Sequence, residues 1–292
     1  MTDTKLIRNG MPGLYSSSNS ASIRAQSIHF WSLRVYLLLL VAAAFVSYMW
    51  ANVFYGALAS AILFLITIGL LIYLKMTRPD DIWYNGRAVA ESIKTRTWRW
   101  IMRATPYEDV SNLEIMSKQF INDLKQILKQ NRSLSKTDIV LDEPVTEIMI
   151  EIRSLTISER LEIYKKQRIN EQSTWYMSKA IYNRKRANFL FWVSILVHLI
   201  AIVMLLFEIN TPSLNFPIGV VAVAASSILT WLQARKHNEL NSSYALAAHE
   251  ITLIKGEALS IKSNEDLSEF VINSENAFSR EHTQWTARKL ED

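Results

Sequence analysis

An uncharged run of forty residues, from Val35 to Leu74, constrains this chain more than any other feature of its sequence. Arg34 precedes the run and Lys75 follows it, so charge fixes both of its ends. One helical crossing of a bilayer takes about 20 apolar residues, because the hydrocarbon core is about 30 Å thick and each helical residue rises about 1.5 Å. The run therefore predicts two membrane spans.

The stretch SYMWANVFYG in the middle of the run marks the turn between these spans. Trp50 and Tyr55 are typical of the membrane interface, and Asn52 and Gly56 are typical of turns. Within lipid the backbone must satisfy its own hydrogen bonds, which favours helices on both sides of the turn. The run thus predicts a helical hairpin with spans near Leu33–Trp50 and Val53–Lys75.

A second hairpin is predicted later in the chain, from Ala187–Phe207 and Ile218–Ala234, with a proline-containing loop between them. Basic residues border both hairpins. Of the 32 Lys and Arg residues, four precede the first hairpin, twenty-one lie in residues 75–186 and seven follow from residue 235. Lys and Arg near short loops stay on the cytoplasmic side. We therefore expect both termini and both charged segments to be cytoplasmic.

The charged segments carry helix signals. Thr105, Thr156 and Ser263 each begin a pattern typical of a helix N-terminus, with an acidic residue three positions later. Apolar residues recur at helical spacing between them. The predicted helices lie near residues 80–103, 107–130, 144–154, 157–186, 236–260 and 265–289, and the fourth is expected to continue without a break into the third span.

The predicted fold class is an all-α integral membrane protein: four transmembrane helices form two hairpins, and the remaining helices form a cytoplasmic bundle. Residues 1–30, which contain the stretch GMPGLYSSSNSAS, are expected to be a flexible cytoplasmic tail. Residues 31–130 are expected to form a first two-transmembrane unit, and residues 131–292 a second. The starts YNGRAVAESI and SYALAAHEI of two predicted helices, after the two hairpins, indicate an internal repeat.

The sequence offers little support for an enzyme. It contains no cysteine, and its five histidines have neither HExxH spacing nor a cysteine partner for zinc. It also lacks a glycine-rich phosphate loop and a GxSxG elbow. The net charge of +5 comes from basic residues that border apolar runs, which does not favour nucleic-acid binding. We expect no catalytic residue, cofactor, metal or nucleic-acid partner.

Three stretches resemble the bacterial SLATT family of SMODS- and SLOG-associating two-transmembrane effector proteins, here as two units in tandem. They are Asp81–Tyr107, Ile157–Trp192 and Phe270–Lys289, and the resemblance spans most of residues 30–290. It implies a membrane effector of a bacterial defence system, located in the inner membrane and triggered by a nucleotide second messenger. A separate partner protein would make or sense that messenger, because the resemblance includes no such domain in this chain.

Small and polar residues lie on one face of the predicted fourth span. Two interpretations compete: the face allows close helix packing, which we favour, or it lines a water-filled pore after the chain forms a homo-oligomer. The second span carries a thinner stripe of the same kind. The residues are Gly219, Ala222, Ser226, Thr230 and Gln233 in the fourth span and Gly56, Ser60 and Thr67 in the second.

His198 is the one histidine inside a predicted span. Ionisable residues within the membrane are often functional, because charge is costly in lipid. We favour a neutral imidazole that is hydrogen-bonded to a neighbouring helix, with Ser194 one turn earlier as a partner.

Charged and aromatic residues near the ends of the predicted cytoplasmic helices have two interpretations. They join helices of the bundle, which we favour, or they form a gate or a docking surface for a partner. The residues are Glu91, Glu171, Glu275, Glu281, His282, Trp285 and Arg288.

The leading functional hypothesis is an oligomeric effector that forms a pore in the lipid bilayer, or disrupts it, when triggered through its cytoplasmic helices. The alternative is a non-conducting membrane scaffold or sensor that recruits cytoplasmic partners. A solute transporter is less favoured, because transporters carry broken or charged helices at mid-membrane.

Overall fold

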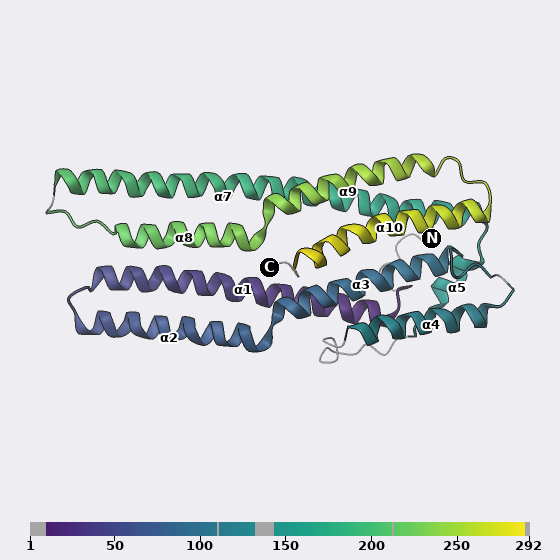
Figure 1. Ribbon diagram of the computed structural model, residues 1–292, viewed down its shortest axis with the longest axis horizontal. Coiled ribbons are helices and arrows are strands. Elements are labelled where there is room, and N and C mark those ends of the chain that lie inside the picture. Colours follow the sequence, from purple (N-terminus) through teal and green to yellow (C-terminus); the bar gives the residue numbers. More distant parts are fainter. Residues whose placement is uncertain (1–9, 110, 132–142, 212, 290–292) are drawn as a thin grey trace. The chain divides into compact units, whose positions relative to one another are not determined.

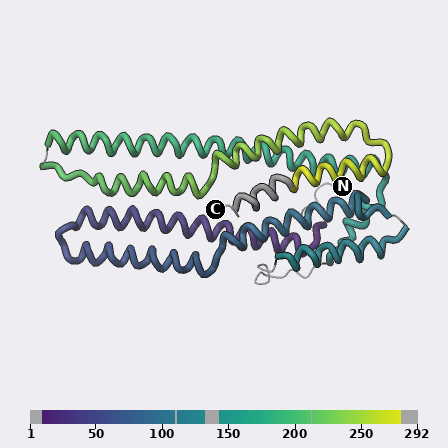
Figure 2. Tube along the Cα trace, viewed as in Figure 1, coloured from purple at the N-terminus to yellow at the C-terminus, as the bar shows by residue number. Residues whose placement is uncertain are grey.

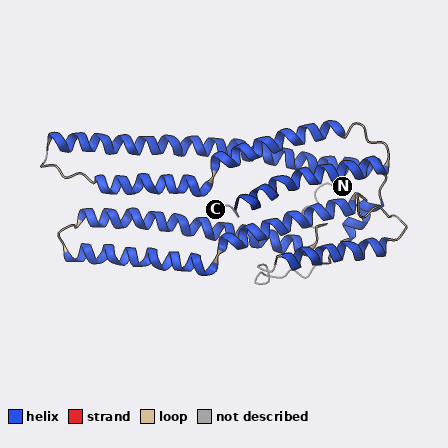
Figure 3. Cartoon of the chain, viewed as in Figure 1, coloured by secondary structure: helices blue, strands red, loops and turns tan. Residues whose placement is uncertain are grey.

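The computed structural model describes residues 10–109, 111–131, 143–211 and 213–289, and for residues 280–289 it describes the backbone alone. The described residues form helices and connecting loops, with no strand among them (Figure 3). The predicted all-α fold class is therefore confirmed. The elements are α1 (Gly13–Met49), α2 (Phe54–Thr77), α3 (Pro79–Ile101), α4 (Leu113–Gln130), α5 (Glu147–Ser154), α6 (Ile157–Tyr164), a π-helical turn (Lys165–Ile169), α7 (Asn170–Asn210), α8 (Ile218–Arg235), α9 (His237–Glu257) and α10 (Asn264–Lys289) (Figure 1).

The chain divides into two compact units, which we describe separately. Residues 27–79 and 180–242 form the membrane unit. Residues up to 26, residues 80–179 and residues from 243 onward form the helical bundle. Each unit therefore draws on both halves of the chain, and several long helices contribute to both.

The membrane unit contains the two predicted hairpins, one from α1 and α2 and one from α7 and α8 (Figure 2). The first turn lies between Met49 and Phe54, where the SYMWANVFYG stretch predicts it. Its two hairpins also touch: the Tyr48 hydroxyl donates to the Asn215 carbonyl oxygen over 2.5 Å. Helix α6, the π-helical turn at Lys165–Ile169 and α7 follow one another without interruption from Ile157 to Asn210, as predicted for the helix that runs into the third span.

The surfaces of the spans explain why these helices need lipid. Four helical segments are long and apolar enough to cross a membrane, and their most apolar windows are buried within the chain by 17%, 11%, 0% and 11%. In water, each Å² of this exposed apolar surface would be unfavourable by about 25 cal/mol. None of the residues in the third window is buried, and Phe191 and Trp192 on this helix are exposed. The protein is therefore a multi-pass membrane protein.

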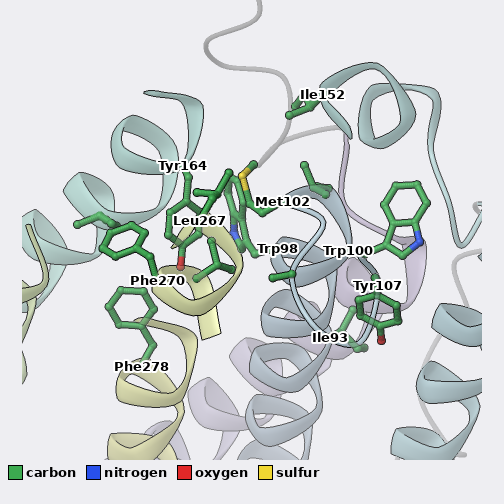
Figure 4. Close-up of a cluster of buried hydrophobic side chains, with 14 of the residues drawn as sticks. Ile93, Trp98, Trp100, Met102, Tyr107, Ile152, Tyr164, Leu267, Phe270 and Phe278 are labelled. Atoms are coloured by element: carbon green, nitrogen blue, oxygen red, sulfur yellow. The ribbon is translucent and has the colours of Figure 1, made fainter. Parts of the chain in front are cut away.

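The helical bundle has a dense aromatic core, shown in Figure 4. Trp98 and Trp100 from α3 are fully buried. Trp98 packs edge-on against Tyr164, with ring centroids 5.5 Å apart, and Tyr164 packs edge-on against Phe270 at 5.9 Å. Helices α3, α6 and α10, far apart in sequence, thus share one core.

Two of the three predicted helix starts are confirmed. Thr156 forms a complete capping box with Glu159 at the start of α6. Ser263 accepts from the backbone N–H of Asp266, whose carboxylate accepts in return from the Ser263 N–H. Each exchange satisfies backbone donors that a helix N-terminus leaves unpaired.

The predicted helix start at Thr105 is wrong, because α4 begins only at Leu113, capped by Asn112. The buried guanidinium of Arg153 gives the physical reason. It donates to the carbonyl oxygens of Trp100, Tyr107 and Asp109, the latter two at 2.7 and 2.9 Å. These bonds tie the non-helical residues 107–109 to Arg153 on α5.

The expected flexible tail is also corrected. Residues 1–9 lie outside the described part of the chain, but α1 already begins at Gly13 and its first residues pack into the bundle. Ser18 and Ser22 are buried. The Ser22 hydroxyl donates to the Trp83 carbonyl oxygen over 2.9 Å, which ties α1 to α3. A Ser-rich segment thus forms a helix because small side chains allow close packing there.

The indicated internal repeat has a backbone counterpart. Arg78 follows α2 and Lys236 follows α8, and both adopt the left-handed conformation, with φ of 44° and 46°. Their N–H groups donate to Leu74 and Leu232, over 3.0 and 3.1 Å. Left-handed backbone costs a non-glycine residue about 1 to 2 kcal/mol. Each hairpin therefore ends in the same unfavourable turn, on a basic residue.

Gly86 on α3 tests the packing of α1 within the bundle. A Cβ atom there would lie 3.1 Å from the Ser18 carbonyl oxygen and 3.2 Å from Ser22. We predict that Gly86→Leu destabilises the protein by about 1 to 3 kcal/mol, the usual range for overpacking. Gly256→Leu is the matched control, because nothing lies within 4 Å of its Cβ position. Unfolding of both variants in detergent, followed by tryptophan fluorescence, checks this; equal loss of stability in both variants would contradict it.

Candidate functional site

The candidate site is a buried cluster of polar side chains around Glu275 in the helical bundle. Glu275 lies on α10, and its side chain has an exposed fraction of 0%. Arg168, in the π-helical turn, lies opposite it with an exposed fraction of 1%. A buried carboxylate is stable only when it is paired and hydrogen-bonded, so its partners define the site.

Four hydrogen bonds satisfy the Glu275 carboxylate. Arg168 donates from Nε to Oε1 over 2.8 Å and from Nη2 to Oε2 over 2.6 Å, a bidentate pair. The Tyr164 hydroxyl donates to Oε1 over 2.9 Å, and the Thr95 hydroxyl donates to Oε2 over 2.9 Å. The donors come from α3, α6 and the π-helical turn, so one carboxylate joins these elements to α10.

Burial and charge shift the titration of this cluster. Burial alone lowers the pKa of Arg168, but attraction to Glu275 and the hydrogen bonds to it outweigh burial and raise that pKa. Burial, and then the negative charge of Glu275, raise the pKa of Tyr164 well above its ordinary value. Arg168 therefore stays charged and Tyr164 stays a neutral donor at physiological pH.

Lys94 on α3 is a second buried basic side chain near the cluster. Burial lowers its pKa first, and the positive charge of Arg168 lowers it further, whereas Glu91 and Glu171 raise it. Glu91 also pairs with Arg87 over 2.8 Å, one helical turn away. Three of the predicted gate residues therefore act on the same two basic side chains. Glu91 and Glu171 raise the pKa of Lys94, and Glu275 and Glu91 raise the pKa of Arg168.

The π-helical turn at Lys165–Ile169 presents Arg168 to the cluster. Such turns are rare and occur frequently at functional sites. Arg168 Cζ lies 4.8 Å from the centre of the Phe278 ring, and its Nη1 atom is buried without a hydrogen-bond partner among the described residues. The pair is therefore tightly held but not fully satisfied.

The remaining predicted gate residues, Glu281, His282, Trp285 and Arg288, lie on α10, but their side chains are outside the described part of the structure. Their role as a gate or docking surface stays a prediction.

Sequence reasoning named Glu275 but missed Thr95, Lys94, Tyr164 and Arg168. A signal was present in the pattern. Arg168 falls four positions after Tyr164 and seven after Leu161, on the buried face of its helix. Glu275 falls four positions after Val271, on the buried face of α10. Opposite charges at core positions of two helices indicate a buried ion pair.

The two small-residue stripes of the membrane unit have different surroundings. Gly56, Ser60 and Thr67 on α2 are buried. The Ser60 hydroxyl donates to the Ala43 carbonyl oxygen on α1 over 3.4 Å. The thinner stripe thus lies inside the first hairpin, and the choice between packing and pore lining for it stays a prediction.

The stripe on α8 faces away from the rest of the chain. All five of its members, Gly219, Ala222, Ser226, Thr230 and Gln233, are exposed. The Thr230 hydroxyl donates to the Ser226 carbonyl oxygen of its own helix over 2.9 Å. A Cβ atom at Gly219 would meet nothing within 4 Å. This face therefore has no packing partner among the described residues of its own chain.

His198 lies on the exposed surface of α7. Its Nδ1 lies 2.7 Å from the Ser194 carbonyl oxygen, which can only accept, so Nδ1 carries the proton. The imidazole thus bonds to its own helix backbone, one turn earlier, rather than to a neighbouring helix.

Comparison with family models gives two consecutive matches. The model described as SMODS and SLOG-associating 2TM effector domain 3 matches residues 12–161. The model described as SMODS and SLOG-associating 2TM effector domain 1 matches residues 164–285. Searches of curated proteins and of solved structures gave no match. Thr95 and Lys94 lie in the first matched range, whereas Tyr164, Arg168 and Glu275 lie in the second.

The charge balance at Glu275 generates a stability prediction. Glu275→Leu leaves Arg168 buried without its carboxylate, and we predict a loss of about 3 to 5 kcal/mol in the free energy of unfolding. The double variant Arg168→Met/Glu275→Leu removes both charges and should recover most of that loss. Urea unfolding in detergent measures both variants.

The exposed pair Glu114 and Lys118, with side-chain exposed fractions of 76% and 70%, supplies the control. Glu114→Leu should leave the unfolding midpoint unchanged, because exposed ion pairs contribute little. If the double variant Arg168→Met/Glu275→Leu lost more stability than Glu275→Leu alone, the two side chains would not act as a pair.

Proposed function

Because this chain belongs to the SLATT family of two-transmembrane effector domains, which are associated with defence systems, we propose that it oligomerises and permeabilises the bacterial inner membrane. Two domains of the family stand in tandem. The proposed action is a change of assembly and packing rather than catalysis, and it requires no cofactor.

One observation carries the proposal: the exposed small and polar face of α8. In lipid, a hydroxyl or amide without a partner is unfavourable, whereas a second helix or a column of water satisfies it. Ser226, Thr230 and Gln233 lie along this face, and of these the Thr230 hydroxyl already donates to the Ser226 carbonyl oxygen of its own helix. Copies of the chain that turned this face toward a common axis would line a pore with hydroxyl and amide groups.

The trigger is proposed to act on the helical bundle. Glu275 holds α3, α6 and α10 together through its four hydrogen bonds, so a partner or ligand that displaced α10 would release several contacts at once. In the family context, that partner is proposed to make or sense a nucleotide second messenger. The bundle is proposed to be cytoplasmic, with both termini on that side.

Substitution of the polar face separates a pore from a non-conducting scaffold. We predict that Ser226→Leu/Thr230→Leu lowers ion leakage from liposomes at least tenfold, because leucine fills and dehydrates the lining. Leakage of a fluorescent dye or of potassium from liposomes that contain the protein measures this.

The matched control is Ser226→Thr/Thr230→Ser, which keeps both hydroxyl groups and should leak like the original chain. Cross-linking should show the same oligomer in all three proteins. Unchanged leakage in the leucine variant would contradict a pore lined by α8. If the original chain bound its partner but caused no leakage, a scaffold would be favoured.

The proposed topology is testable with introduced cysteines, because the chain has none of its own. Ser213 is exposed in the loop of the second hairpin, and Gln126 is exposed on α4. We predict that Ser213→Cys reacts with a membrane-impermeant maleimide added to spheroplasts, whereas Gln126→Cys reacts only after permeabilisation. The reverse labelling would place the bundle outside the cell.

A further inference from the structure

Three arginines mark one end of the membrane unit. Arg34 stands at the start of the first span on α1, Arg186 immediately precedes the third span on α7, and Arg235 immediately follows the fourth on α8. The first and third spans begin where the fourth ends, so the three guanidinium groups occupy the same membrane face, at the level of the lipid headgroups.

Aromatic rings contact two of these arginines through their faces. Arg34 Cζ lies 5.0 Å from the centre of the Trp231 ring. Arg235 Cζ lies 4.3 Å from the centre of the Phe30 ring and 5.7 Å from that of Trp231. Phe30 and Trp231 in turn contact each other edge-on at 5.9 Å. The rings form one shelf from α1 and α8 that supports two guanidinium groups.

The third guanidinium, that of Arg186, lies over the ring of Tyr182, which also acts on Arg235. Arg186 Cζ lies 5.4 Å from the centre of the Tyr182 ring. Burial lowers the pKa of Arg235, Tyr182 raises it, and the positive charges of Arg34 and Arg186 lower it again. Arg34 and Arg186 therefore act on the same neighbour. We name Arg34, Arg186 and Arg235 the arginine collar.

The collar has an excess of positive charge. Within the described residues, none of its three guanidinium groups forms an ion pair with a carboxylate. His237 beside it does not add charge, because burial and then Arg235 and Arg186 lower its pKa to about 4. Its Nδ1 lies 2.7 Å from Asn183 Oδ1. Arg34 and Arg186 are exposed, so their N–H groups remain accessible from the membrane surface.

We infer that the arginine collar binds the phosphate group of an anionic phospholipid. A guanidinium that stacks on a ring keeps its edge N–H groups free for phosphate oxygens, which it binds bidentately. Basic sites between transmembrane helices at this depth are suited to anionic headgroups, and the adjacent rings suit the start of an acyl chain. The lipid would neutralise like charges that the fold otherwise holds together, and it would bridge the two hairpins.

Thermal unfolding of the full chain in a neutral detergent tests the inference. Phosphatidylglycerol should raise the unfolding midpoint by several degrees, whereas phosphatidylcholine with the same acyl chains and inorganic phosphate should not. An equal shift with phosphatidylcholine would show that the headgroup charge is not recognised. An equal shift with inorganic phosphate would indicate a free-anion site instead of a lipid site.

A pair of variants with equal change in charge locates the site. Arg34→Gln/Arg235→Gln should lose the shift caused by phosphatidylglycerol. Arg184→Gln/Lys185→Gln removes two exposed basic residues of the neighbouring run, outside the collar, and should keep the shift. Retention of the shift in the first variant, or its loss in both, would overturn the assignment to the collar.

A measurement on the original chain keeps the inference testable if the collar variant does not fold. In native mass spectrometry, phosphatidylglycerol should remain bound at collision energies that remove phosphatidylcholine. Equal retention of the two lipids would overturn the inference. Neither experiment depends on whether the protein conducts ions.

Discussion

The exchange of water for lipid around four apolar helices is the constraint on which the rest of the structure depends. The most apolar windows of these helices are at most 17% buried within the chain, so they are stable only in a solvent as apolar as themselves. That solvent cannot bond to the backbone, which makes helices obligatory. It also removes the hydrophobic drive for helix association, so contacts between spans rest on small residues and polar atoms. The Ser60 hydroxyl of α2, which donates to the Ala43 carbonyl oxygen of α1, is an example.

The helical bundle solves the opposite problem, because water surrounds it and apolar burial drives its packing. Its aromatic core nevertheless encloses charge. Four protein donors replace water around the Glu275 carboxylate. The pair alone does not explain stability, because a hydrophobic pair of similar volume is often no less stable than a buried ion pair. What a buried pair supplies in addition is specificity, since only one register of α10 brings Glu275 to Arg168. We interpret the cluster as the feature that fixes one arrangement of these helices.

Sequence patterns predicted the helix ends at both hairpin turns to within a few residues, because hydropathy and flanking charge act over whole helices. Local capping signals predicted less reliably. The Thr156 pattern forms a complete capping box at the start of α6. The Thr105 pattern instead falls next to a loop whose Tyr107 and Asp109 carbonyl oxygens accept from Arg153, a residue 48 positions after Thr105. Among the partners of Glu275, Thr95 was equally beyond local patterns, because it meets Glu275 across 180 residues of sequence. Long-range contacts of this kind come from the fold and not from spacing.

The tandem arrangement raises the question of whether each family domain is an independent unit, and the contacts argue against it. The carboxylate of Glu275, in the second matched range, accepts from Thr95 in the first. Phe30 and Arg34 of the first range pack against Trp231 and Arg235 of the second. Both the helical bundle and the membrane unit are thus built from both domains. The left-handed turns at Arg78 and Lys236 stand at the same place after each hairpin, whereas the polar partners of Glu275 come from different places in the two domains.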